Sequence, residues 1–322
     1  MSAAQDFVLA IDFGGTKVAV ATAGLDGEIA ESVRLDTDAP RGARQVVQRA
    51  LVAARELVAR TRAARGGRPL AAGAVSPGIV LDDGVLLAPN VPGWEDLSLP
   101  ALLREGLALE RVRVMTDVKA AALAEARWGN LRDADPGVLL SLGTGLAAAV
   151  VIDGRVLNGA NGAAGEIGYM LRGAGDQGGA AHGRAPLEEA VAGRAIGERG
   201  SRLLGERLTA EQVFSSDDPR ARALVSEVLA ELAVHVANVA ILIDPARLAV
   251  GGGLMGSGRR VLDALGARLR EAVPFPPELV PARFGPDGAL RGAVALALDG
   301  AQSSGGAART RPHDDAVKGE AR

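Results

Sequence analysis

The sequence of 322 residues contains no cysteine, so the chain can form neither a disulfide framework nor a thiolate metal site. Aromatic residues make up only 2% of it, and a core must therefore be packed by Ala, Val and Leu. Few side chains are left to stack on bases or sugar rings, which makes Trp94 and Trp128 conspicuous.

The sequence also lacks a surplus of positive charge, since its formal net charge is −3. Such a balance provides no basic field for nucleic acid or for an anionic membrane, and we expect neither as a partner. The N-terminus lacks a basic segment followed by a signal-length apolar run. The longest apolar stretches, such as residues 232–243, look too short or too interrupted to span a bilayer. We therefore expect a cytoplasmic protein.

With 48% hydrophobic residues, the chain is long enough for two moderate cores, and we expect two lobes. Near its start, apolar residues 7–11 predict a buried strand, and residues 18–21 predict the partner of that strand in a hairpin. Between them stand Asp12, Gly14, Gly15, Thr16 and Lys17. Glycines that adopt positive φ and lack a Cβ let backbone N–H groups approach a phosphate, although the same pair could simply close a tight turn.

The residues that follow this turn show patterns typical of single strands and helices. A strand follows the Asp26-Gly27 turn, helical spacing covers residues 42–64, and a buried strand ends at Ser76-Pro77-Gly78. Residues 111–129 then predict a strand that runs directly into an Ala-rich helix at Asp117.

The same order of elements starts again at residue 137, with a strand, the turn Gly143-Thr144-Gly145, a second strand, an Asp-Gly turn and a third strand. Helices are predicted over 187–204 and 220–243, and residues 246–273 predict a strand, a third glycine turn (Gly251-Gly252-Gly253) and a helix. Two copies of one unit indicate a duplicated α/β fold with a cleft between the copies. Three glycine turns that follow strands indicate a nucleotide site.

Together these motifs resemble the ROK family (repressors, open reading frames and kinases) of the sugar kinase, Hsp70 and actin superfold. Over residues 7–300 the matching stretches occur in family order: IDFGGTK, SPGIV, APNVPGW, TDVKAAALAE, SLGTGLAAAVVIDG, GANGAAGEIGYM, PLEEAVAG and LAVGGGL. The resemblance implies a duplicated actin-like, ribonuclease H-like ATPase fold with two lobes and the active site in the cleft between them. We expect an N-terminal lobe over 1–118, a C-terminal lobe over 119–290, a helix over 291–301 that packs back on the first lobe, and a disordered tail over 302–322.

The resemblance also implies roles for the residues at the glycine turns. It implies that Asp12 holds Mg²⁺ through water and that Asp117 is the catalytic base. The alternative for Asp117 is an ordinary N-cap of a helix that begins at Val118. A carboxylate that accepts the proton of a sugar hydroxyl suits in-line phosphoryl transfer from ATP. The implied ATP and phosphate-binding residues are Asp12, Gly14, Gly15, Thr16, Lys17, Gly143, Thr144, Gly145, Gly251, Gly252 and Gly253.

For the sugar, the resemblance implies the carboxylates of Glu166 and Glu188, which suit vicinal hydroxyls. The neighbouring Glu189 is the alternative to Glu188, because surface helices often carry such pairs in the first turn. The loop with Asn90 and Trp94 lies near the sugar in the family, or is a plain Pro-Gly turn with a packed Trp. The complete implied set for the sugar is Gly78, Asn90, Thr116, Asp117, Glu166, Tyr169 and Glu188.

The sequence departs from the family at two places. Members usually bind zinc through a His and a block of three cysteines; here Tyr169 replaces the His, the block reads AAHGRAPLEE, and His182, His235 and His313 are too scattered to replace it. We expect no zinc site. Thr116 stands where the family commonly has an Asn that touches a sugar hydroxyl, so recognition around the ring is altered. An amino sugar such as kanosamine is therefore a candidate substrate.

The resemblance thus implies an enzyme that phosphorylates the 6-hydroxyl of a glucose-like hexose with ATP and Mg²⁺. Alternatives are a plain glucokinase, an N-acetylhexosamine or mannosamine kinase, or a sugar-sensing protein without catalysis. The repressor branch of the family carries a DNA-binding domain before the first strand, and only six residues precede that strand here. The implied partner is a small sugar, and we expect a homodimer.

Overall fold

The computed structural model describes residues 4–81, 84–86, 91–176 and 178–302. The first of its two large sheets has the strand order β3-β2-β1-β4-β7. Strands β1 (Phe7–Phe13), β2 (Lys17–Gly24) and β3 (Ile29–Asp36) form an antiparallel meander, which confirms the predicted hairpin. Strands β4 (Pro69–Ser76) and β7 (Val112–Thr116) extend the sheet in parallel from β1. Strands β5 (Ile79–Val80) and β6 (Val85–Leu86) pair separately.

The second sheet repeats this topology, with the order β10-β9-β8-β11-β12. Its antiparallel part consists of β8 (Gly137–Leu142), β9 (Leu146–Ile152) and β10 (Arg155–Val156). Strands β11 (Arg247–Gly251) and β12 (Glu278–Pro281) continue in parallel from β8. The internal duplication predicted from the glycine turns is therefore confirmed, and the structure has the expected α/β class.

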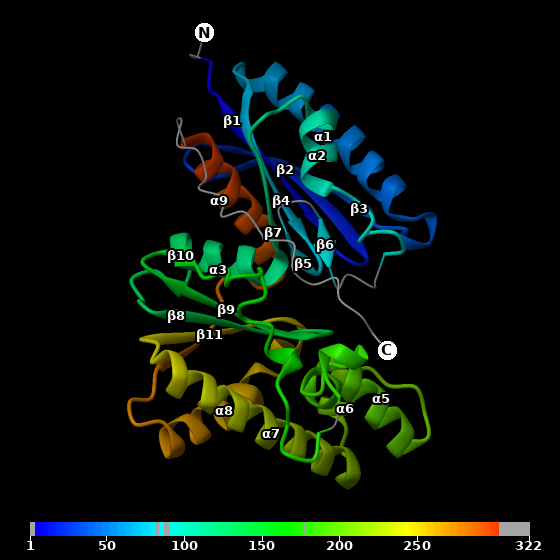
Figure 1. The fold of residues 1–322 in the computed structure, drawn as a ribbon, viewed down its shortest axis with the longest axis vertical. Helices are drawn as coiled ribbons and strands as arrows, with labels where there is room; N and C mark the ends of the chain where they lie inside the picture. The colour runs from blue at the N-terminus through cyan, green and yellow to red at the C-terminus, as the bar shows by residue number, and fades with distance from the viewer. Residues whose placement is uncertain (1–3, 82–83, 87–90, 177, 303–322) are drawn as a thin grey trace, which may run out of the picture.

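The helices form layers around the two sheets (Figure 1). On the first sheet, α1 (Ala43–Arg65) and α2 (Leu99–Leu107) cover one face, and α9 (Gly288–Gln302) covers the other. Helix α3 (Asp117–Trp128) packs against both α9 and the second sheet, so these two helices form the layer between the lobes. The far face of the second sheet carries α4 (Glu188–Val191), α5 (Gly193–Leu204), α6 (Ala210–Ser215), α7 (Pro219–Ile243) and α8 (Gly258–Ala272).

Strand β1 shows how the sequence specifies these layers. Because successive side chains of a strand point to opposite faces, Leu9 and Ile11 pack toward α1, whereas Val8 and Ala10 pack toward α9. All four are fully buried. A strand that is apolar on both faces is what a sheet between two helical layers requires.

The structure corrects three expectations. By length and composition alone, helix α7 is long and apolar enough to span a membrane. Our expectation that the apolar stretch containing residues 232–243 is too short to do so is therefore wrong. Half of the most apolar window of α7 is buried inside the protein, as in a core helix. Neither Gly14 nor Gly15 has positive φ, so the first turn does not need a left-handed backbone; a Cβ on Gly14 would lie 2.8 Å from the carbonyl oxygen of Lys17. Gln302, assigned to the tail, belongs to α9, while residues 303–322 lie outside the described part.

Candidate active site

The first glycine turn joins β1 to β2, and Thr37 holds its backbone through two hydrogen bonds. The N–H of Gly14 donates to the carbonyl of Lys17 at 3.0 Å. Thr37 directly follows β3, is buried, and donates its Oγ1 to the carbonyl of Gly14 at 2.6 Å and its N–H to that of Thr16 at 2.8 Å. Gly15, Thr16 and Lys17 remain exposed, so the turn presents its outer edge to a ligand.

The second turn rests against the start of α5. The N–H of Gly193 donates to the carbonyl of Gly143 at 2.9 Å, and the N–H of Arg194 donates to that of Thr144 at 3.2 Å. A Cβ on Gly193 would lie 2.6 Å from the carbonyl oxygen of Gly143, so the close approach of helix and turn requires glycine there.

The third turn lies beside the proposed base. Gly251 ends β11, and both Gly251 and Gly252 line a cavity of about 130 Å³ together with Asp117, Glu125 and other residues of α3 and α9. Gly252 has φ 94°, and a Cβ on it would lie 2.4 Å from the carbonyl oxygen of Leu142. The cavity therefore lies between the third glycine turn and the start of α3.

Asp117 follows β7 and is the first residue of α3. Its Oδ1 accepts a hydrogen bond from the N–H of Val118 at 2.7 Å. A capping residue would precede the helix and accept from the second or third helical N–H, so the N-cap alternative is wrong. The side chain reaches solvent in the cleft, yet protein surrounds it closely enough that burial raises the pKa of Asp117.

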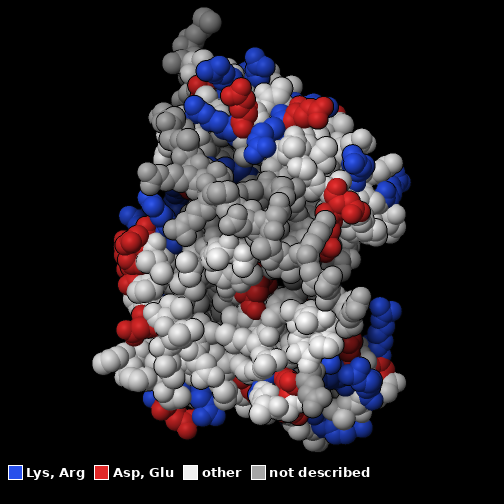
Figure 2. Space-filling model, in the orientation of Figure 1, with Lys and Arg blue, Asp and Glu red and all other residues white. Residues whose placement is uncertain are grey.

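The predicted carboxylates come together around Asp117. Burial raises the pKa of Asp12 to about 7, with repulsion from Asp117 as the next cause and attraction to Arg34 opposing it. Burial, followed by Asp117, also raises the pKa of Glu166, while Glu188 adds to the rise and Lys119 opposes it. Figure 2 shows acidic side chains in the hollow between the two lobes, at the centre of the view.

Tyr169 belongs to the same cluster. It ends the short 3-10 helix η2 (Ile167–Tyr169), which directly follows Glu166. Burial, then Glu166 and Glu188, raises the pKa of the Tyr169 phenol, because a phenolate beside two carboxylates is disfavoured. Glu166, Tyr169 and Glu188 are thus close enough to interact electrostatically.

The structure distinguishes Glu188 from its neighbour. The Oε2 of Glu188 accepts the N–H of Leu146, just after the second glycine turn, at 2.8 Å. Glu189 instead forms an exposed ion pair with Arg184 and accepts the N–H of Ala185 at 3.0 Å. Glu188 therefore faces the turn, and Glu189 faces solvent.

Lys119 is a site residue that the sequence analysis missed. It is 3% exposed, and its Nζ donates to the carbonyls of Asn158, at 3.3 Å, and of Gly162. Burial lowers the pKa of Lys119, whereas Glu166 raises it. The chain has only three lysines, and two of them, Lys17 and Lys119, belong to this site; that scarcity is the signal that could have identified it.

The remaining residues predicted near the sugar are Gly78, Thr116, Trp94 and Asn90. Gly78 has φ 81°, and Thr116 pairs with Ser76 across β4 and β7 and is buried. Trp94 is fully buried, donates Nε1 to Ser76 Oγ at 2.9 Å and packs edge-on against Phe13, so the interpretation as a packed Trp is confirmed for it. Asn90 lies outside the described residues.

No group of three or more His, Cys, Asp and Glu side chains that could hold a metal ion is found among the described residues. His182 ends the exposed 3-10 helix η3 (Ala180–His182), His235 is buried in α7, and His313 lies outside the described part. Asp12 supplies one carboxylate at the first glycine turn, and Asp117 lies within electrostatic reach of it. That arrangement fits Mg²⁺, which commonly takes one or two carboxylates together with the phosphates of a nucleotide.

The family model "ROK family" matches residues 8–300. The chain is 30% identical to a kanosamine kinase of Amycolatopsis mediterranei over 299 residues, which cover 90% of this chain and 95% of the relative. It is 31% identical to an N-acetyl-D-glucosamine kinase of Yersinia pseudotuberculosis, over 67% of this chain and 76% of that protein.

Solved structures agree in fold. A ROK hexokinase from Thermus thermophilus superposes with a TM-score of 0.76 at 28% identity, covering 90% of this chain and 97% of that chain. A Streptomyces griseus ROK glucokinase in complex with glucose and AMPPNP gives 0.73 at 26%, covering 91% and 99%. A ROK transcriptional regulator, a homologue of the E. coli MLC protein, gives 0.79 at 25%, covering 92% of this chain and 78% of the regulator.

Proposed function

This chain belongs to the ROK family and has the actin-like ATPase fold of its sugar kinases, and we propose that it transfers the γ-phosphoryl group of ATP to the 6-hydroxyl of a hexose. The observation that carries the proposal is the position of Asp117. It opens α3 between the lobes, beside a cavity shared with Gly251 and Gly252 and within electrostatic reach of Asp12 and Glu166.

In this proposal Asp117 accepts the proton of the sugar hydroxyl as the hydroxyl oxygen attacks the γ-phosphorus, while the bond from that phosphorus to the β,γ-bridging oxygen breaks and ADP leaves. A hydroxyl is a poor nucleophile near pH 7, so a positioned acceptor lowers the barrier. The raised pKa of Asp117 makes its carboxylate a stronger base than an aspartate of ordinary pKa. Glu166 and Glu188 would hold ring hydroxyls and fix the angle of attack.

The glycine turns would hold the nucleotide. The exposed edge formed by Gly15, Thr16 and Lys17 suits the phosphates, with the second turn, Gly143 to Gly145, facing them from the other lobe. Asp12 would hold Mg²⁺ through water, and its pKa near 7 reflects a buried carboxylate that a cation would stabilise. Bound Mg²⁺ neutralises charge on the transferred phosphoryl group.

For the substrate we propose an amino hexose of the kanosamine type. Four carboxylates (Asp12, Asp117, Glu166 and Glu188) form a series in which each lies within electrostatic reach of the next, while the amine of Lys119 is already bound to two carbonyls. A surplus of negative charge favours a cationic sugar amine over a neutral hydroxyl. Thr116 in place of an Asn leaves room for the amine or for a bridging water. A plain glucokinase or an N-acetylhexosamine kinase is the alternative.

The test is a coupled ADP-release screen with glucose, mannose, N-acetylmannosamine, N-acetylglucosamine, glucosamine and kanosamine. We expect the highest kcat/KM with an amino hexose, and we expect Thr116→Asn to shift the preference toward glucose. Equal or better efficiency with glucose in the wild-type protein would reject the amino sugar and leave a glucokinase.

A sugar-sensing role without catalysis is the second candidate, because a ROK regulator also superposes on this chain. Sugar binding without ADP formation, for every sugar of the screen, would favour it. We further propose that the protein acts in the cytoplasm as a homodimer without structural zinc. Sedimentation velocity would test the dimer, and elemental analysis would test for zinc.

A further inference from the structure

The segment that joins Tyr169 to Glu188 leaves the core soon after it begins. Ile167 is buried and Met170 packs against the core of the second lobe, but residues 171–175 are exposed. The segment is rich in glycine and includes Gly173, Gly175 and Gly178. Apolar packing therefore holds the two ends of this segment, where Met170 and Leu187 contact the core, and polar contacts hold the exposed residues between those ends.

Arg172 supplies the first of these contacts. Its Nη2 donates to Glu231 Oε2 at 3.0 Å, and its Nε donates to Glu231 Oε1, so the pair is bidentate. The Arg172 N–H also donates to Asp176 Oδ2 at 2.6 Å, which folds the segment back on itself. The side chain of Glu231 is only 18% exposed. A bidentate, half-buried pair fixes a geometry better than an exposed single contact does.

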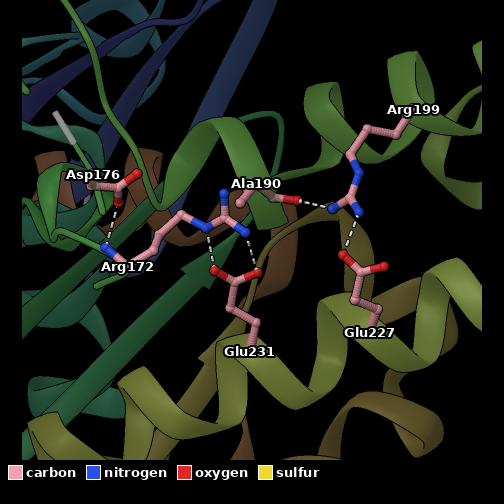
Figure 3. Close-up of polar contacts among 6 residues, drawn as sticks. All are labelled: Arg172, Asp176, Ala190, Arg199, Glu227 and Glu231. Carbon is pink, nitrogen blue, oxygen red and sulfur yellow. Dashed lines mark hydrogen bonds and ion pairs between the residues drawn. The ribbon is translucent and has the colours of Figure 1, made fainter. Parts of the chain in front are cut away.

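Arg199 makes a second ion pair with α7, one helical turn before Glu231; this pair is single, and the side chain of Glu227 is 60% exposed. Its Nη2 donates to Glu227 Oε1 at 2.6 Å, and its Nη1 donates to the carbonyl of Ala190 at 2.9 Å. Ala190 lies in α4, the four-residue helix that begins with Glu188. Figure 3 shows both arginines reaching the same helix, α7, from different segments.

Helix α7 is a suitable fixed support. Twelve of its 25 residues are buried in the core of the second lobe. The spacing of Glu227 and Glu231 places them on one face of the helix. We propose that Arg172 and Arg199 are positioning residues that, through Glu231 and Glu227, hold Tyr169 and Glu188 at the sugar site. This inference rests on the proposed function, because it assumes that Tyr169 and Glu188 contact the sugar.

A purely structural role is the alternative, since exposed ion pairs often contribute little beyond some stability. The two roles predict different results. A structural pair would lower the melting temperature and leave the sugar KM and the order of Tyr169 unchanged. A positioning pair would change both the sugar KM and the order of Tyr169.

Tyr169 provides a direct readout, because it is the only tyrosine in the chain. Protein labelled with 3-fluorotyrosine should give a single ¹⁹F NMR resonance. In Arg172→Gln we expect that resonance to broaden or split, and in the exchanged pair Arg172→Glu with Glu231→Arg we expect it to become narrow again. The matched control is Arg60→Gln, which removes an ion pair of 2.9 Å between α1 and Glu31 of β3 in the other lobe.

The kinetic test uses the sugar that the ADP screen identifies. We expect Arg172→Gln and Arg199→Gln each to raise the sugar KM on the order of 5-fold, the factor for about 1 kcal/mol. The ATP KM and the Arg60→Gln control should stay at wild-type values. A ¹⁹F line in Arg172→Gln as narrow as in the wild type, or an unchanged sugar KM with a lowered melting temperature, would overturn the inference.

The NMR readout does not depend on turnover. If no sugar yields ADP but Arg172→Gln still broadens the Tyr169 resonance, the proposed function fails while the positioning of Tyr169 is supported. If sugars are phosphorylated and Arg172→Gln changes neither the line nor the KM, the positioning role alone is rejected.

Discussion

The third glycine turn permits a sharp test, because two adjacent glycines have opposite surroundings. Gly252 has φ 94° and ψ 172°, a backbone conformation that is open almost only to glycine. A Cβ there would lie 2.4 Å, 2.5 Å and 2.7 Å from the carbonyl oxygen, carbonyl carbon and amide nitrogen of Leu142. A Cβ on Gly253 would meet no atom within 4 Å.

Backbone strain of this kind costs roughly 1–3 kcal/mol, and overpacking against rigid backbone adds about 1–3 kcal/mol. For Gly252→Ala we therefore expect a loss of about 3 kcal/mol in the free energy of unfolding. At roughly 2 °C for each kcal/mol in a chain of this size, the melting temperature should fall by about 6 °C. Because β11 would be pushed away from β8, the ATP KM should rise as well.

Differential scanning fluorimetry and ADP-release kinetics measure both effects. Gly253→Ala is the control, and we expect it to keep the wild-type melting temperature to within about 1 °C, because an added methyl group there meets nothing. Equal melting temperatures for Gly252→Ala and the wild type would refute the reasoning, since they would mean that β8 and β11 are not packed as described.

Three further predictions concern titration and charge. The pKa of Asp12 is raised from 3.8 to about 7, so its contribution to stability is greatest below pH 3.8 and is lost as the pH rises to 7. Without Mg²⁺, Asp12→Asn should therefore be more stable than the wild type at pH 8, and this advantage should shrink in thermal melts as the pH is lowered from 7 toward 3.8. Lys119→Met should leave the carbonyls of Asn158 and Gly162 without their donor and raise the sugar KM about 10-fold, whereas unchanged kinetics would show that the lysine does not shape the site. The absorbance of Tyr169 at about 295 nm should titrate above pH 10, and Glu166→Gln should lower the midpoint of that titration. An unchanged midpoint would show that the two residues do not interact.

Much of the fold could be predicted from the sequence, because it depends on local patterns. The run Phe7–Phe13 is apolar on both faces, and each glycine turn follows such a run directly. The repeat of that pattern after residue 137 was enough to predict two equivalent sheets. The division of the chain at residue 118 stays a prediction.

The supports of the site could not be predicted, because they join residues far apart in the chain. Thr37 contacts Gly14 across 23 positions, and Lys119 contacts Gly162 across 43. Arg172 and Glu231 are 59 positions apart. No local pattern specifies which of 36 basic residues meets which acid, since that choice depends on how the layers pack.

The central claim is that Asp117 is the proton acceptor in phosphoryl transfer, and Asp117→Asn tests it most directly. The amide keeps the shape and size of the side chain but cannot take the proton. With the sugar and Mg-ATP both saturating, we predict that kcat falls on the order of 100-fold or more while the sugar still binds, as followed by the Tyr169 ¹⁹F resonance. A kcat near the wild-type value in Asp117→Asn would contradict the account.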